Sequence, residues 1–318
     1  MADRELLVGD IGGTNARFAI AQPDGQIAAI KVLKVADFPN FADALDAYLG
    51  QLGDRPDAMC IASAGAKRGD EIHLTNAPWT LDESDLATRF GFPVVRIIND
   101  FAAQARFAGT MPAAAREELK SGTSLPGAPV LTIGPGTGFG QAIFLPGQPP
   151  RVVPTEGGHR LLPVRNAREL RLRDRLEAEL GHPPILEEAL SGRGIVNLYR
   201  AVMVDRGEEP AALDPPAVTQ AALAGPGAER DAILWFLDLL ACAAADACLS
   251  TGARGGVAIS GGIVPRITAL LAETDFPVAF ARPGILEDYL SLAPVYLVRE
   301  PYAALYGTAA MMRDSLHG

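Results

Sequence analysis

The 318-residue sequence is poor in cysteine and lysine. Its three cysteines, Cys60, Cys242 and Cys248, cannot all pair, and no Cys-x-x-Cys occurs, so nothing indicates a disulfide framework, a cysteine zinc site or a redox motif. We therefore expect each cysteine to be a buried structural residue. The four lysines lie at positions 31, 34, 67 and 120, and none follows a glycine, which excludes a P-loop.

Positive charge and membrane signals are also scarce. The net charge of −10 argues against general binding to nucleic acids or anionic membranes. The first five residues lack the basic-then-apolar layout of a signal peptide. The most apolar stretch, residues 233–250, contains Asp238 and Asp246, which are costly inside a bilayer, so it predicts a buried helix. We expect a soluble, cytoplasmic protein.

Hydrophobic residues are abundant, at 48% of the chain, and their spacing predicts an α/β protein of two related lobes. Short apolar runs between turn residues predict strands over residues 5–11, 16–22, 26–35, 57–63, 71–75, 94–98, 130–133, 140–145, 256–260 and 295–298. Helical periodicity predicts helices over residues 40–51, 82–90, 101–108, 166–180, 191–206, 228–250 and 301–316. Residues 110–129 have no clear period and contain three prolines, so we expect a domain boundary there.

Two strand–turn–strand units carry a glycine-rich turn with a threonine. The first contains Gly12, Gly13 and Thr14 after Asp10, and the second spans residues 134–140. Such turns can direct successive backbone N–H groups at an anion, and Asp10 could hold a metal ion through water. The second turn is not a dinucleotide fingerprint, because Phe139 and a strand follow where a helix is needed. The pair indicates a phosphate clamp, with ordinary hairpin turns as the alternative.

Several polar residues could bind or activate a substrate. Asn99 and Asp100 follow a buried strand, where α/β sheets bind ligands, although Asp100 could simply cap the helix after it. Glu156 and His159 flank two glycines without a further metal ligand at suitable spacing, which favours hydrogen bonding to a polyol. Glu187 could join them, or it could belong to an ordinary helix surface.

Together these residues resemble bacterial glucokinase, over nearly the whole chain and in the same order. The matching motifs are Asp10–Arg17, Thr75-Asn76, Ile98-Asn99-Asp100, Gly134–Gly140, Glu156–His159, Glu187–Tyr199 and Gly261–Arg266. The resemblance is to the zinc-free branch of the actin-like sugar kinases, because no cysteine-rich loop follows Glu156–His159. It implies two ribonuclease-H-like lobes, with a cleft between them, that close over ATP and a hexose. We expect a small α/β lobe at 1–109 plus 300–318 and a large α+β lobe at 110–299.

The resemblance also implies ATP-dependent phosphorylation of D-glucose at the 6-hydroxyl, the first step of glycolytic glucose use, by a homodimer. Asp100 would be the general base and would bind the sugar together with Asn76, Asn99, Glu156, His159 and Glu187. The turns would bind ATP through Gly12, Gly13, Thr14, Asn15, Gly136, Thr137 and Gly138, with Gly261 and Gly262 facing the adenosine. Asp10 would orient Mg²⁺.

Other functions are consistent with some of these features. A kinase of the same build could act on fructose, mannose or an N-acetylated sugar. A sugar-sensing protein without turnover is disfavoured because no DNA-binding extension is visible and Asp100 is present. An ATPase or phosphatase of the actin-like superfamily is disfavoured because Glu156, His159 and Glu187 suit a polyol acceptor better than water.

Overall fold

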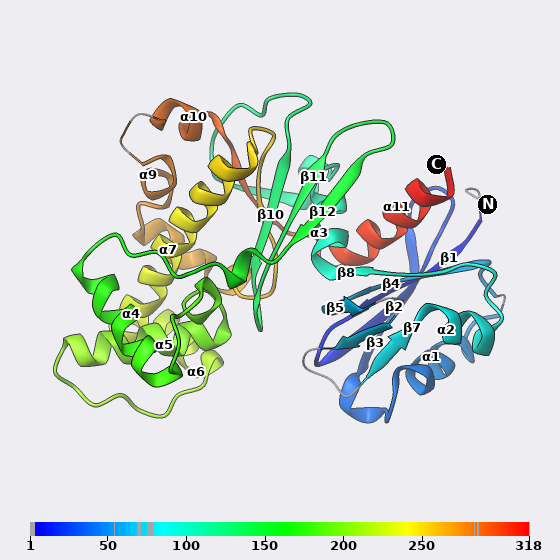
Figure 1. Cartoon of the computed structure of the whole chain (residues 1–318), viewed down its shortest axis with the longest axis horizontal. Coiled ribbons are helices and arrows are strands. Elements are labelled where there is room, and N and C mark those ends of the chain that lie inside the picture. Colours follow the sequence, from blue (N-terminus) through cyan, green and yellow to red (C-terminus); the bar gives the residue numbers. More distant parts are fainter. Residues whose placement is uncertain are drawn as a thin grey trace. The chain divides into compact units, whose positions relative to one another are not determined.

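The computed structural model describes residues 4–53, 55–68, 71–74, 79–282, 284 and 286–317. The chain forms two compact units. The first comprises Met1–Met111, Phe144–Pro154 and Glu300–Gly318, and the second comprises Pro112–Ile143 and Thr155–Arg299. The colours of Figure 1 show how the C-terminal helix, in red, returns to the elements of the N-terminal segment, in blue and cyan.

The first unit is built on a five-stranded sheet with the strand order β3-β2-β1-β4-β8. Its strands are β1 (Leu6–Ile11), β2 (Asn15–Ala21), β3 (Ile27–Lys34), β4 (Ala58–Ser63) and β8 (Val95–Asn99). β1, β4 and β8 are parallel, whereas β2 and β3 return antiparallel. Because Ile11 pairs with Ser63 and Ser63 with Asn99, the three parallel strands end at one edge of the sheet.

Helices and a small sheet complete the first unit. The helices are α1 (Phe41–Leu49), α2 (Glu83–Phe90), α3 (Asp100–Ala108) and α11 (Ala303–His317), and the small sheet contains β5 (Gly65–Arg68), β6 (Glu71–Leu74) and β7 (Thr80–Asp82). Phe18 packs on Phe41 and Tyr48, and Phe41 packs on Trp79 in turn. All four aromatic side chains are buried, so they form the centre of the core on this side of the sheet.

The second unit contains a six-stranded sheet with the order β12-β11-β10-β13-β14-β9. Its strands are β9 (Arg116–Lys120), β10 (Val130–Pro135), β11 (Phe139–Leu145), β12 (Arg151–Thr155), β13 (Gly256–Ile259) and β14 (Val295–Val298). β10, β13 and β14 are parallel, as are three strands of the first unit. The two strand–turn–strand units predicted from the sequence are therefore the hairpins β1–β2 and β10–β11.

A long apolar helix organises the core of the second unit. The α-helices there are α4 (Ala167–Leu180), α5 (Gly192–Asp205), α6 (Pro215–Ala224), α7 (Ala228–Thr251), α8 (Val264–Ile267), α9 (Phe276–Ala281) and α10 (Glu287–Leu292). By length and composition α7 could cross a membrane, but 78% of its most apolar window is buried inside the protein. It is therefore built like the core helix of a soluble protein, which confirms the predicted buried helix.

The structure differs from the sequence-based expectations in two places. A boundary between the units, between Met111 and Pro112, lies within residues 110–129, but the same segment also contains the unpredicted strand β9, which pairs antiparallel with β14. Residues 144–154, expected in the large lobe, belong to the first unit because Phe144 packs against α3. The guanidinium of Arg106 lies 5.7 Å from the Phe144 ring centre, and Gly109 leaves no room for a side chain beside that ring. The remaining bounds of the two lobes stay a prediction.

Candidate active site

The first glycine turn connects β1 to β2 at the carboxyl edge of the first unit's sheet. The Gly12 N–H donates to the Asn15 carbonyl over 3.0 Å, which closes a tight turn around Gly13 and Thr14. The Thr14 carbonyl accepts from the Val35 N–H, while the residue itself is exposed to solvent. The turn is thus anchored through its backbone, and its open side faces solvent.

Asp10 lies on β1 directly opposite Arg17 on β2. Arg17 Nη1 donates to Asp10 Oδ2 over 2.7 Å, and only 16% of the Asp10 side chain is exposed. Burial raises the pKa of Asp10, and the Arg17 guanidinium opposes this shift without cancelling it. Asp10 is therefore a buried acid whose charged form is stabilised by the Arg17 guanidinium.

Asn99 and Asp100 stand where β8 passes into α3. Asn99 is the N-cap of that helix, because its Oδ1 accepts the Ala102 N–H over 2.9 Å. Asp100 is the first helical residue, and its Oδ1 accepts the Phe101 N–H over 2.8 Å. The interpretation that Asp100 is merely the helix cap is therefore wrong, since Asn99 has that role.

The second glycine turn connects β10 to β11 in the second unit. Its Gly136 N–H donates to the Gly138 carbonyl over 2.8 Å, and Thr137 between them is exposed. The Gly261-Gly262 segment follows the neighbouring strand β13. Gly261 has φ +89° and approaches the Pro135 carbonyl so closely that a Cβ would lie 2.7 Å from its oxygen. The structure thus brings together the two glycine segments of this unit that were predicted to bind ATP.

Glu156, His159 and Glu187 come from two short 3₁₀ turns, Gly157–His159 and Leu186–Glu188. The adjoining backbones are joined by hydrogen bonds, from the Leu162 N–H to the Pro184 carbonyl and from the Leu186 N–H to the Arg160 carbonyl. The side chains of Glu156 and His159 are 80% and 62% exposed, and His159 Nδ1 lies 3.5 Å from Glu156 Oε2. These exposed groups offer both donors and acceptors to a polar ligand.

The predicted residues fall into both units. Asp10, the first turn, Asn99 and Asp100 belong to the first unit, and the remaining described ones belong to the second. Asn76 lies outside the described residues.

Three further residues were missed from the sequence. They are Arg17, Arg193 near Glu187, and Ser63, a buried residue whose hydroxyl has no hydrogen-bond partner within the described part of the chain. Arg17 could have been found, because a tight β1–β2 turn places it opposite Asp10. Ser63 and Arg193 carry no such signal.

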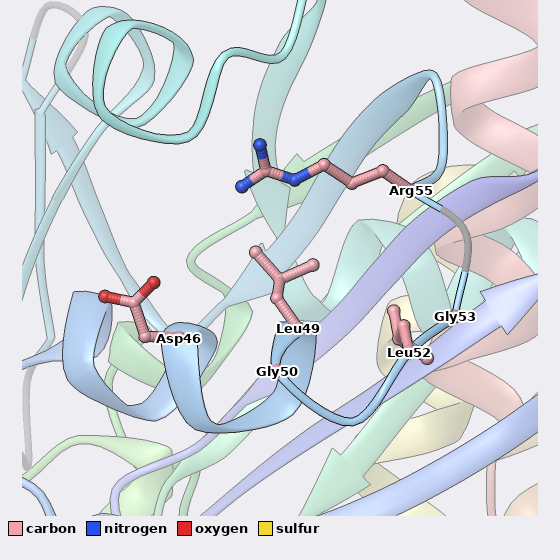
Figure 2. Close-up of a pocket in the computed structure, with 6 residues that line it drawn as sticks. All are labelled: Asp46, Leu49, Gly50, Leu52, Gly53 and Arg55. Atoms are coloured by element: carbon pink, nitrogen blue, oxygen red, sulfur yellow. The ribbon is translucent and has the colours of Figure 1, made fainter.

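A surface pocket of about 370 Å³ lies elsewhere in the first unit. Figure 2 shows its lining, which includes Asp46, Leu49 and Arg55 at the end of α1 and in the loop after it. None of the predicted site residues lines it. We therefore assign it no part in the site.

Comparisons with known proteins agree with the motifs. The glucokinase family model matches residues 7–315. The glucokinase of Chromohalobacter salexigens is 38% identical, covering 98% of both chains, and that of Paramagnetospirillum magneticum is 34% identical, covering 97% of this chain and 98% of the relative.

Solved structures give the same result. A glucokinase from an Antarctic psychrotroph has a TM-score of 0.87 at 33% identity, covering 98% of this chain and 99% of the other. A glucokinase of the ROK family from Streptomyces griseus, solved with glucose and AMPPNP, has a TM-score of 0.65 at 19% identity, covering 96% and 98% respectively, and shows the common fold. The fold is therefore the two-lobe actin-like α/β fold. On this sequence and structural evidence the chain belongs to the glucokinase family, and its activity is the ATP-dependent phosphorylation of glucose.

Proposed function

We propose that the protein transfers the γ-phosphoryl group of ATP to the 6-hydroxyl of D-glucose, with Asp100 as the general base. The attacking hydroxyl must lose its proton to an acceptor within about 2.6–3.2 Å. A carboxylate at the first position of α3 is fixed by the helix and by β8, so it can be held in line with that hydroxyl. The capping bond of Asn99 fixes this junction further.

The observation that carries the proposal is the carboxyl edge of the first unit's sheet. β4 lies between β1 and β8, and all three strands end in register. The turn at Gly12–Thr14 and the Asn99-Asp100 pair therefore follow strands about 10 Å apart. A phosphoryl group bound by the turn and a hydroxyl beside Asp100 would meet at this edge.

The donor set at the first turn fits a Mg²⁺ ion that arrives with ATP. Mg²⁺ is commonly held by one or two carboxylates together with substrate phosphates and waters. Asp10 offers one carboxylate, and the described residues contain no cluster of three or more acidic, histidine or cysteine ligands. When bound, Mg²⁺ supplies positive charge that neutralises the β- and γ-phosphates. The Thr14 and Thr137 hydroxyls and the N–H groups of the two turns would bind the phosphates.

Recognition of the sugar would depend mainly on the second unit. Glu156, His159 and Glu187 present carboxylate and imidazole groups that pair with hydroxyls, and Asn76 and Asn99 would add amide groups. A buried hydroxyl without its partner costs about 1–3 kcal/mol, so these groups would discriminate between hexoses. Glucose is the expected substrate, since the similar glucokinases from Balamuthia mandrillaris and Streptomyces griseus were solved in complex with glucose.

The setting of the reaction also belongs to this proposal. The acidic chain, with a net charge of −10, is expected to act in the cytoplasm, without nucleic acid or membrane, in the first step of glycolysis. The resemblance to the family supports a homodimer.

The experiment that tests the proposal measures ADP release with ATP and Mg²⁺ across glucose, fructose, mannose and N-acetylglucosamine. We expect glucose to give the highest kcat/KM. Product analysis by NMR should identify glucose 6-phosphate. Absence of ADP release with every sugar would overturn the proposal, and a preference for another hexose would correct the substrate.

A further inference from the structure

Glu187 joins the segment assigned to the sugar with the turn assigned to the ATP phosphates. Its Oε2 accepts the Phe139 N–H over 2.8 Å. A Cβ on Gly138 would lie only 2.6 Å from the same oxygen, so the carboxylate rests directly on the turn backbone. The Gly192 N–H, at the start of α5, also donates to the Gly136 carbonyl over 2.8 Å. The glycine turn, Glu187 and the start of α5 are therefore one hydrogen-bonded group.

A single arginine neutralises the two adjacent carboxylates of this group. Arg193 Nη2 lies 2.9 Å from Glu188 Oε1 and 3.4 Å from Glu187 Oε1. The side chains of Glu187 and Glu188 are only 19% and 6% exposed, so water screens their mutual repulsion poorly. In the part of the chain that the structure describes, Arg193 is the one cation paired with either of them, and the buried Glu188 Oε2 has no hydrogen-bond partner.

We propose that Arg193 is a positioning residue for sugar binding, which holds the Glu187 carboxylate between the glycine turn and the hexose hydroxyls. This rests on the proposed function, in which Glu187 binds the sugar. Without Arg193 the Glu187 carboxylate loses the cation that holds it in place, and the two carboxylates also repel each other across a poorly hydrated space. The Glu187 carboxylate then no longer accepts the Phe139 N–H. Its orientation toward the sugar changes, and so does the conformation of the glycine turn.

Arg193 can be replaced without disturbing the core. Its side chain is 57% exposed. The start of α5 is capped independently of it, because Ser191 Oγ accepts the Gly194 N–H over 3.1 Å. A folded R193L variant is therefore expected.

The test compares R193L, R193K and a matched control, R206L. Arg206 follows the other end of α5 and pairs with Asp231 over 2.7 Å. We expect R193L to raise the glucose KM and the calorimetric glucose Kd by about 10-fold or more, and the ATP KM by a smaller factor. R193K should recover much of the loss because it restores the charge, and R206L should stay within about twofold of the wild type.

A double variant separates positioning of Glu187 from mere neutralisation of Glu188. R193L/E188Q removes the buried charge of Glu188 but leaves Glu187 without its cation. We expect its glucose KM to stay well above that of the wild type. Wild-type glucose affinity in R193L, or its full recovery in R193L/E188Q, would overturn the proposal. Failure of the wild-type protein to phosphorylate any sugar would instead overturn the proposed function.

Discussion

Asn99 and Asp100 are neighbours in the chain with different tasks. The amide of Asn99 accepts a backbone N–H and so begins α3, while Asp100 lies within the first turn of that helix. A negative side chain is favourable at a helix N-terminus, so the first turn of α3 suits an acidic residue such as Asp100. The two side chains can therefore be tested separately.

The D100N variant tests the proposed general base. Asparagine keeps the size and the hydrogen-bond acceptor of Asp100, but it cannot take a proton at neutral pH. We expect kcat to fall by at least about 10²-fold, while folding and calorimetric glucose affinity are largely retained. The control is D82N, because Asp82 caps α2 through the Asp85 N–H over 2.7 Å. Near-normal turnover in D100N would contradict the assignment.

The three cysteines are predicted to be inert in the native protein. All are buried, and burial raises the pKa of Cys60 to about 12 and that of Cys248 to about 11. Since the thiolate is the reactive form, native protein should show no fast reaction with a thiol reagent at pH 7, and denatured protein should show three thiols. A rapidly modified native thiol would contradict this expectation.

At the scale of elements, the position of α3 depends on its crossing with α11. Gly307 on α11 lies so close to the Ala103 carbonyl on α3 that no side chain fits between them. One turn further, Arg106 donates to both carboxylate oxygens of Asp314, over 2.6 and 3.2 Å. Since α3 begins with Asp100, the C-terminal helix helps to hold the proposed base.

A methyl group at Gly307 should separate these helices. We expect G307A to lower the free energy of unfolding by about 1–3 kcal/mol or more in urea titrations, and to reduce kcat by displacing α3. The control is G53A in the same unit, where a Cβ would meet no atom within 4 Å. An unchanged free energy of unfolding in G307A would contradict this prediction, because it would mean that α3 and α11 accommodate the added methyl group.

Lys120 on β9 forms hydrogen bonds with carbonyl groups at the end of α10, and its titration makes the stability of the protein depend on pH. Its Nζ donates to the carbonyls of Ser121, Ser291 and Ala293 over 2.9, 2.6 and 3.0 Å. Burial lowers the pKa of Lys120 below its ordinary value of 10.5. Between that lowered pKa and 10.5 the unfolded state binds more protons, so Lys120 makes stability rise with pH in this window.

The K120M variant tests this contribution. It leaves three carbonyls without the Lys120 donor, and we expect it to lower the free energy of unfolding by about 1–3 kcal/mol at pH 7. The rise of stability through the alkaline window should also be smaller in K120M than in the wild type. Denaturant titrations at several pH values measure both effects. If the free energy of unfolding changed with pH in the same way in both proteins, the lowered pKa of Lys120 would be contradicted.

At the scale of the whole molecule, the proposed machinery is divided between the two units. The first unit carries Asp10 and Asp100, and the second carries Glu156, His159 and Glu187. Both sets must act on one glucose molecule for the proposed reaction to occur. We therefore expect glucose to reduce the radius of gyration measured by X-ray scattering, with galactitol as a non-substrate control. An unchanged radius at saturating glucose would count against closure.

The sequence predicts an element well where its side-chain pattern reflects burial. β1, β4 and α7 are buried along most of their length, and their apolar runs located them to within a residue or two. β9 was missed because four of its five residues are charged, which is common in a strand at the edge of a sheet. Its partner, β14, is also far away in the sequence. A hydrophobic pattern within β9 cannot indicate which distant strand pairs with it.

The fold class, the two glycine turns and the residue types that suit phosphates and a polyol could all be predicted from the sequence, because these features depend on local chemistry and order along the chain. The contacts between these groups became known only from the folded structure. It assigned the cap of α3 to Asn99, paired Asp10 with Arg17, and set Glu187 on the Phe139 N–H beside Arg193. Such contacts depend on strand register and helix packing, through which residues distant in the sequence come within hydrogen-bond distance.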